Sequence, residues 1–237
     1  MQIRSLLAAA ALCGLTAIGL SASPITGTFN IDGTITVTPT TISWQLSTAP
    51  FTAQKATIGP AATGDFSGLA GTTVTIRNLN NATEPVGVTF AQQPFISFDA
   101  APSFPTLNIN FIFGGIYSSA LCAASPAAVG QTCTLNGSPF NFVNNPPPAS
   151  PQATATFAFT GVTSDGLETW QGNFTSQFTV PYQQVLAQLQ SSGSVTNTFS
   201  ATFSLSPVPQ VPEAGTLSLL GLGLVALSVK LRKRNQA

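Results

Sequence analysis

The 237-residue sequence contains no histidine, and only 6% of its residues are charged. Without histidine the chain cannot assemble a Ser-His-Asp or Cys-His nucleophile system or a His-based zinc site. A typical soluble domain is about one quarter charged, so this composition also differs from that of an ordinary cytosolic protein. The 17 phenylalanines nevertheless supply apolar surface for a core, which disordered chains usually lack.

Basic residues are scarce in the body of the chain. Between Pro24 and Gln210, six carboxylates outweigh Lys55 and Arg77 and give a net charge of −4. Four of the other five basic residues lie close to the C-terminal end. A mildly acidic body has no electrostatic footprint for nucleic acid, so we expect no nucleic-acid partner.

The N-terminal end has the three parts of a secretory signal peptide. Arg4 supplies the positive charge, Leu6–Leu20 form an apolar stretch of suitable length, and small residues follow. We expect cleavage after Ser21 or Ala22, so that residues 1–22 form the signal peptide. An uncleaved anchor helix is the alternative.

The C-terminal end holds a second apolar segment. Ala214–Val229 contains no charge and, as a helix, would be about 24 Å long, close to the ~30 Å hydrocarbon core of a bilayer. A buried core helix would normally carry a polar stripe, and this segment has none. Basic residues that follow such a span stay on the cytoplasmic side, which predicts a transmembrane helix with the body outside.

Pro212-Glu213 precedes the apolar run, and a cluster of Lys and Arg follows it; this order resembles the PEP-CTERM sorting signal of bacterial exported proteins. The resemblance implies recognition and processing by an exosortase, a membrane protease. It gives the recognition element as Val211, Pro212, Glu213 and Ala214, and the stop-transfer cluster as Lys230, Arg232, Lys233 and Arg234. The family usually has Pro-Glu-Pro, and Ala214 stands at its third position. The segment 211–237 is therefore expected to be a sorting and anchor segment, with a plain anchor as the alternative.

The body between the two ends alternates apolar and polar residues with a period of two. In one stretch the alternation places Leu107, Ile109, Phe111 and Phe113 on one face. Two others do the same with Ala155, Phe157 and Phe159, and with Val195, Phe199, Ala201, Phe203 and Leu205. Strict alternation predicts antiparallel strands with one buried face. We expect residues 23–205 to be an all-β antiparallel sandwich, followed by a proline-rich spacer at 206–210.

Turn and helix signals complete this prediction. Asp32-Gly33 and Asp165-Gly166 each separate two strand-like runs and predict tight hairpin turns. One short helix is expected at Tyr182–Gln190, with Pro181 in its first turn and Gly193 at its end. Residues 118–151, rich in Ala, Asn and Pro, are predicted to form a long surface loop.

Two cysteines, Cys122 and Cys133, lie within the predicted loop. Thiols outside the cytoplasm oxidise, so we expect a disulfide between them, with free thiols as the alternative. The third cysteine, Cys13, would leave with the signal peptide. No cofactor or metal is expected, because no cluster of suitable ligands accompanies these residues.

Chemistry-bearing side chains are few. The closest pair of body carboxylates, Asp165 and Glu168, is better explained by the hairpin turn and by the polar face of a strand than by glycoside hydrolysis. Trp44 and Trp170 are candidates for sugar stacking, although Trp170 also has the alternation of a core residue. The sequence thus predicts a non-enzymatic envelope or matrix protein. The alternative is a carbohydrate-binding module acting on exopolysaccharide.

Overall fold

The computed structural model describes residues 23–146 and 152–209, together with Gly221 and Gly223. Pro24–Val208 forms one compact unit. The second unit, Met1–Ser23 with Pro209–Ala237, lies almost entirely outside the described residues. The expected signal peptide and the expected C-terminal helix therefore fall outside the description.

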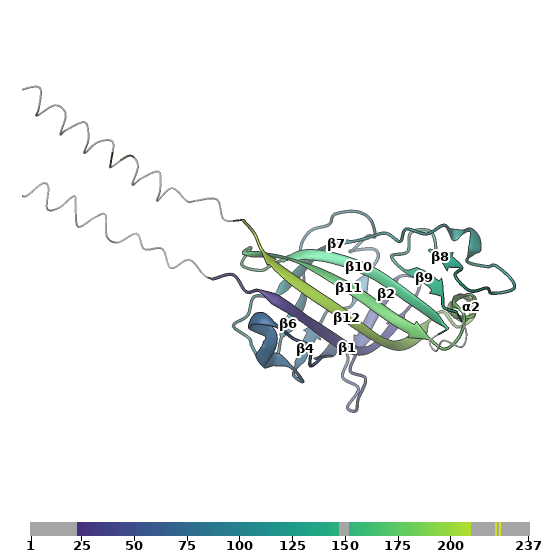
Figure 1. The fold of residues 1–237 in the computed structure, drawn as a ribbon, viewed down its shortest axis with the longest axis horizontal. Coiled ribbons are helices and arrows are strands. Elements are labelled where there is room, and N and C mark those ends of the chain that lie inside the picture. Colours follow the sequence, from purple (N-terminus) through teal and green to yellow (C-terminus); the bar gives the residue numbers. More distant parts are fainter. Residues whose placement is uncertain (1–22, 147–151, 210–220, 222, 224–237) are drawn as a thin grey trace, which may run out of the picture. The chain divides into compact units, whose positions relative to one another are not determined.

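The unit Pro24–Val208 is an eight-stranded antiparallel barrel (Figure 1). Each of the eight strands pairs with the next along the chain, and the last pairs with the first. These strands are β1 (Gly27–Val37), β3 (Lys55–Ile58), β4 (Thr73–Ile76), β6 (Gln93–Phe98), β7 (Leu107–Ile112), β10 (Ala153–Thr163), β11 (Glu168–Phe178) and β12 (Val195–Pro207). The predicted all-β antiparallel class is confirmed, and the predicted two-sheet sandwich is corrected to a single sheet that closes on itself.

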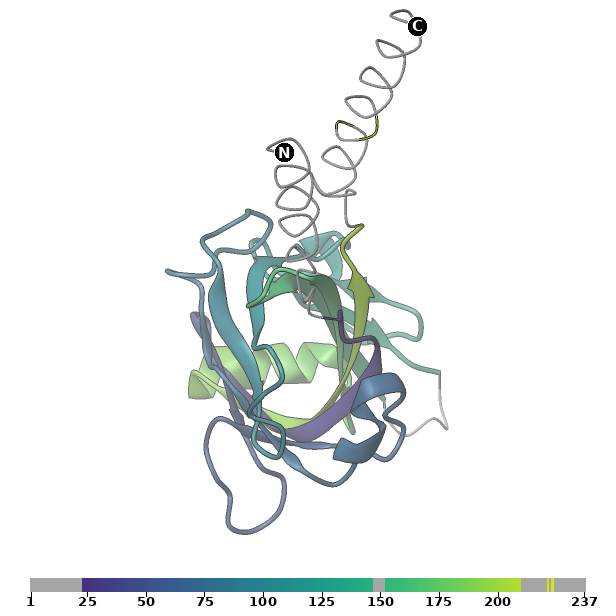
Figure 2. The same ribbon diagram turned by 90° about the vertical axis from the view of Figure 1, so that its left-hand side faces the viewer.

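Four short strands and three helical segments complete the unit. The strands are β2 (Thr41–Gln45), β5 (Leu79–Asn80), β8 (Thr132–Cys133) and β9 (Asn141–Asn144). The helical segments are the 3-10 turns η1 (Gly64–Leu69) and η2 (Ser119–Leu121) and the helix α2 (Tyr182–Ser192). Seen along the barrel axis, α2 lies across one end of the barrel (Figure 2). No helix among the described residues is long and apolar enough to span a bilayer.

Aromatic rings fill the barrel interior. The rings of Phe29 and Phe203 stack with centroids 5.0 Å apart, and the ring of Trp44 meets that of Phe199 edge-on at 4.9 Å. Small residues between large ones make room for the rings. At Gly172, a Cβ atom would collide with the ring of Phe159, so only glycine fits there.

The outer surface of the barrel is polar and mostly uncharged. The exposed positions of β12 alternate with its core positions and carry only Thr and Ser up to Ser206. Hydroxyl groups pair across neighbouring strands, as between Thr36 and Thr196, whose Oγ1 atoms are 2.9 Å apart. Because hydroxyl and amide side chains cover this surface, the exterior of the barrel is hydrophilic although it carries few charges.

Most of the predicted inward-facing residues are confirmed, with one change of phase in β7. Phe111 and Phe113 were expected beside Leu107 and Ile109, but Ile112 is buried in their place. The pairing of β7 with β10 shifts its register between Thr160 and Gly161, which leaves one extra residue on β7. A bulge of this kind reverses the faces of the residues beyond it.

The local signals had mixed outcomes. Asp165-Gly166 forms the predicted turn between β10 and β11, with Gly166 at φ 75°. Asp32-Gly33 does not turn: both residues lie inside β1 and pair with Ser200 and Phe199 of β12, so that prediction was wrong. The tight-turn signal is overridden here by continuous pairing along the strand.

The helix prediction is confirmed, and the loop prediction is corrected in part. Helix α2 begins at Tyr182 as expected, extends to Ser192, and ends at Gly193 with φ 74°. Pro181 takes the N-cap position. The described residues of the expected loop at 118–151 contain η2, β8 and β9, so this region adds two short strands to the sheet.

The end of the barrel where β1 begins is closed by a buried carboxylate. Glu168, expected on a polar strand face, has 0% of its surface exposed. Its Oε1 accepts a hydrogen bond from Ile25 N at 2.5 Å, and its Oε2 accepts one from Thr163 Oγ1 at 2.6 Å. We call this the base of the barrel, since β1 begins and β12 ends there.

On the outer surface, Asp99 binds three neighbours across β3, β4 and β6. Lys55 Nζ lies 2.7 Å from both carboxylate oxygens, and the hydroxyl groups of Thr73 and Thr75 donate at 2.5 and 2.9 Å. Burial raises the pKa of Asp99, but these hydrogen bonds and the charge of Lys55 outweigh burial. The pKa therefore lies below the ordinary value of 3.8.

Glu168→Ala should destabilise the barrel by about 1–3 kcal/mol, because it leaves the part-buried Ile25 amide without its acceptor and removes the shorter of the two acceptors of the Thr163 hydroxyl. Urea denaturation of the variant measures the change. Gln171→Ala, on the exposed face of the same strand, is the matched control and should stay close to the parent. Equal stability of the two variants would contradict the role of Glu168.

The lowered pKa of Asp99 predicts a defined pH dependence of stability. Its carboxylate contributes stability that is fully present above the unfolded pKa of about 3.8 and is lost as the pH falls through the folded value. Asp99→Asn should therefore flatten the acid limb of the stability curve measured by denaturation at a series of pH values. Ser97→Ala, exposed on β6 just before Asp99, should leave the limb unchanged, and an identical limb in both variants would argue against the prediction.

Candidate functional site

At the end covered by α2, the barrel wall is widened by the short strands. β1 pairs with β3 only at Ile31 and Asp32, while residues 34–37 pair with β2. On the opposite side, β10 pairs with β7 through residues 159–163 and with β9 through residues 153–156. The wall at this end is therefore built partly by strands outside the eight-stranded circuit, and it leaves a space below α2.

This space is a cavity of about 1030 Å³. Its aromatic lining comes from Phe140, Phe142, Phe174 and Phe178, and its aliphatic lining includes Ile35, Ile42, Leu79, Ile112, Leu135 and Val195. Helix α2 contributes Val185, Leu186 and Leu189 to the lining. The lining is thus apolar where the cavity meets the barrel core.

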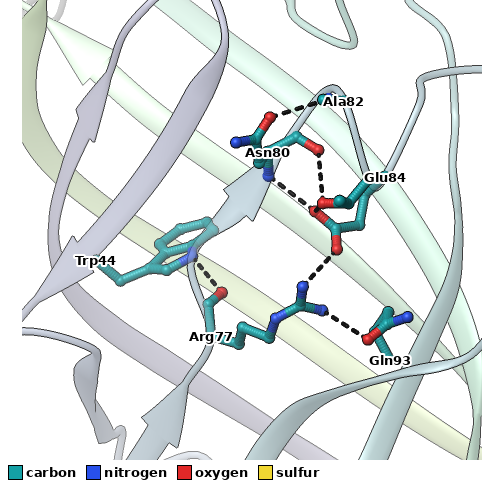
Figure 3. Close-up of polar contacts among 7 residues, drawn as sticks. Trp44, Arg77, Asn80, Ala82, Glu84 and Gln93 are labelled. Atoms are coloured by element: carbon teal, nitrogen blue, oxygen red, sulfur yellow. Dashed lines mark hydrogen bonds and ion pairs between the residues drawn. The ribbon is translucent and has the colours of Figure 1, made fainter.

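Among the described residues that line the cavity, Glu84 alone is charged, and it is buried. Its Oε2 accepts hydrogen bonds from Asn80 N and Thr83 Oγ1, each at 2.8 Å. Its Oε1 lies 2.7 Å from Arg77 Nη2 (Figure 3). The carboxylate is therefore bound by its own chain and neutralised by one guanidinium.

Arg77 in turn links this carboxylate to the core. Its backbone carbonyl accepts the indole N–H of Trp44 at 3.0 Å (Figure 3). Its guanidinium also reaches Gln93 Oε1 at 3.5 Å. The ion pair thus positions the segment that follows β5 against the wall formed by β2 and β6.

The first turn of α2 is held by a hydrogen-bond network. Asn144 Oδ1 accepts from Tyr182 N at 3.0 Å, and Asn144 Nδ2 donates to Gln183 Oε1 at 2.9 Å. Gln183 Nε2 donates to Gln131 Oε1 at 2.7 Å. Tyr182 is buried against Phe142, and burial raises the pKa of its hydroxyl group. The start of the helix is therefore fixed to β9 and to the loop before β8.

Cys122 and Cys133 are joined by a disulfide with Cα atoms 5.0 Å apart. The bond connects the end of η2 to β8. The residue before the first cysteine, Leu121, accepts the Tyr182 hydroxyl through its carbonyl at 3.0 Å. The crosslink thus holds the loop on which the first turn of α2 rests, and Cys122 itself lines the cavity.

The two tryptophans proposed for sugar stacking lie in the core. Trp44 and Trp170 have 2% and 1% of their surface exposed, and both indole N–H groups bind backbone carbonyls. Their rings pack against Phe199 and Phe95, with centroids 4.9 and 6.0 Å apart. A sugar stacks on an exposed ring face, and neither ring offers one.

The remaining predicted site residues are placed as follows. Asp165 Oδ1 accepts Leu167 N within the turn, and Glu168 is buried at the base. Among the described ranges 23–146 and 152–209, no three potential metal ligands cluster. The predicted sorting residues lie outside the described part of the chain; they are Val211, Pro212, Glu213, Ala214, Lys230, Arg232, Lys233 and Arg234.

Sequence reasoning did not identify the cavity or Glu84. The only available signal was composition: Glu84 follows the single arginine of the body by seven residues, in a region with few other charges. A charge in such a sparse sequence is a candidate for a buried pair. Its place in the cavity wall depends on how the barrel widens, which the local pattern does not record.

Removal of the crosslink by the double change Cys122→Ala and Cys133→Ala should destabilise the unit by about 3 kcal/mol, as expected for closing a loop of this length. Guanidinium denaturation measures the loss. Alkylation of the parent chain under denaturing conditions should label neither cysteine until a reductant is added. Immediate labelling of both, with no stability change in the variant, would contradict the disulfide.

Comparison with known families gave a match to the PEP-CTERM protein-sorting motif over residues 210–234. Neither the comparison with curated proteins nor that with solved structures gave a match. The matched range contains the Pro-Glu pair and the basic cluster singled out from the sequence. A motif of this family marks exported proteins of the cell envelope that an exosortase, a membrane enzyme, processes. The chain therefore carries a PEP-CTERM protein-sorting motif at residues 210–234.

Proposed function

We propose that this chain is an envelope or matrix protein whose barrel is presented outside the membrane, while its C-terminal segment is recognised and cleaved by an exosortase-like protease. The observation that carries the proposal is the motif match at residues 210–234. In this proposal the apolar run spans the bilayer until cleavage, and the basic cluster stays in the cytoplasm.

The end of the barrel supports this division of the chain. β12 extends to Pro207, which includes two residues first assigned to the spacer, and Val208 N donates to Leu167 O at 2.8 Å. The family match begins at residue 210. Cleavage after the Pro-Glu pair would therefore remove no residue of the barrel, and the released body would keep its fold.

We assign the barrel a binding or structural role and no catalysis. The chain has no histidine, and the carboxylates at two positions are already engaged: Glu168 with Ile25 and Thr163, and Glu84 with Arg77. Sugar binding is the other role considered from the sequence. The two residues that suggested sugar binding, Trp44 and Trp170, are buried in the core and offer no ring face to a sugar.

Mass spectrometry of the mature protein from its own host tests the proposal. The parent chain should begin after Ser21 or Ala22 and should lack the residues that follow the Pro-Glu pair. The double change Pro212→Ala and Glu213→Ala should block processing, so that the intact tail to Ala237 accumulates in membranes. Pro209→Ala, just before the matched segment, is the matched control and should be processed normally. An intact Ala237 in the parent protein would reduce the tail to a simple anchor.

A further inference from the structure

The cavity below α2 has the size of a small-molecule site. Pockets for such ligands measure roughly 300–1,000 Å³ and are lined mainly by apolar side chains with a few polar groups. This cavity measures about 1030 Å³. Eight-stranded barrels have an interior just wide enough to hold one small ligand when side chains do not fill it. Here the rings fill the base and the middle, and the space remains at the α2 end.

Water is a poor occupant for the deeper part of this cavity. A buried water needs two to four polar partners, and apolar cavities without them stay dry and take up apolar molecules. Phe142 and Phe174 are buried in this part of the wall, together with Ile35 and Leu79. The polar side chains nearby are already paired: Ser176 Oγ donates to Thr198 O at 2.7 Å. The deeper wall therefore favours an apolar group.

The rim of the cavity is polar and uncharged. Asn81, Asn136, Gln184 and Gln190 line it and are exposed. Their amide groups can both donate and accept hydrogen bonds. A ligand with its apolar part inside would meet these amides with its outer end.

The charge of the cavity lining determines which kind of ligand head group the cavity can accept. Within the part of the chain that the structure describes, the cavity lining contains no lysine or arginine, and its one charge is the carboxylate of Glu84. The body as a whole has a net charge of −4. A fatty-acid anion would find no cation here and would be repelled by the surrounding charge, whereas a cation would have to compete with Arg77 for a carboxylate already bound.

We propose that the cavity binds one uncharged amphipathic lipid, with its apolar chain against Phe142, Phe174 and α2 and its neutral head group at the amide rim. Leu186 and Leu189 of the helix cover the chain. β12 begins with Val195 in the lining of the cavity and ends at the base of the barrel. The site belongs to the unit Pro24–Val208, so binding does not depend on processing of the tail.

Photolabelling of the full-length chain in phosphatidylcholine vesicles tests the proposal. The probe is 1-lauroylglycerol with a diazirine in its acyl chain, and the labelled residues are located by tandem mass spectrometry. Labels should concentrate in residues 135–142 and in α2. Excess 1-lauroylglycerol should remove them, whereas excess laurate at neutral pH, which differs by a charged head, should not.

Leu186→Trp places a larger side chain in the cavity and should lower the labelling of these segments about tenfold. Gln188→Trp, exposed on the same helix and outside the lining, should label as the parent does. Thermal unfolding checks that both variants fold, and the parent chain alone decides the question if one does not. Competition by laurate equal to that by 1-lauroylglycerol would overturn the selection for an uncharged head. Absence of label from the cavity segments of the parent would overturn the site itself.

Discussion

The fold depends on the pairing of its first strand with its last. β1 and β12 pair over eleven residues, from Gly27 with Leu205 to Val37 with Val195. This pairing closes a sheet that would otherwise expose two long edges, and unpaired edges invite association with other chains. It also turns one face of every strand into an interior, so the aromatic core exists only because the sheet closes.

Closure divides the interior into two regions with different properties. Toward the base, stacked and edge-on rings and the hydrogen-bonded carboxylate of Glu168 leave no room for another molecule. Toward α2 the wall is formed partly by β2 and β9, which lie outside the circuit and widen it. The cavity is a consequence of this widening, and the disulfide and Asn144 fix the helix that covers it.

The sequence predicted the class of the fold and most of the residues that face inward, because alternation with a period of two is a local property. It could not distinguish a barrel from a sandwich, since both bury one face of every strand and differ only in whether β1 meets β12. The error at Phe111 and Phe113 has a similar cause. The bulge that reverses their direction depends on how β7 approaches Gly161, where a Cβ atom would collide with the Asn108 carbonyl.

The C-terminal motif was predictable for the opposite reason. Its Pro-Glu pair, apolar run and basic cluster follow one another along the chain, so no long-range contact has to be known to recognise them. Asp32-Gly33 marks the limit of such local reasoning, since the same two residues that predict a turn are held straight by partners 168 and 166 positions away. The role of Glu84 is equally hidden, because Arg77 becomes its partner only when β4 and β5 are in place.

The order of the strands along the chain has a consequence for the timing of folding. The pairing of β1 with β12 joins residues that are far apart in sequence. Such contacts form slowly, because a long loop must close before they contribute. One edge of β1 therefore remains unpaired while the other strands are synthesised, until β12 can pair with it. The sorting motif at residues 210–234 follows β12 closely along the chain, so the strand that closes the barrel is synthesised immediately before the motif.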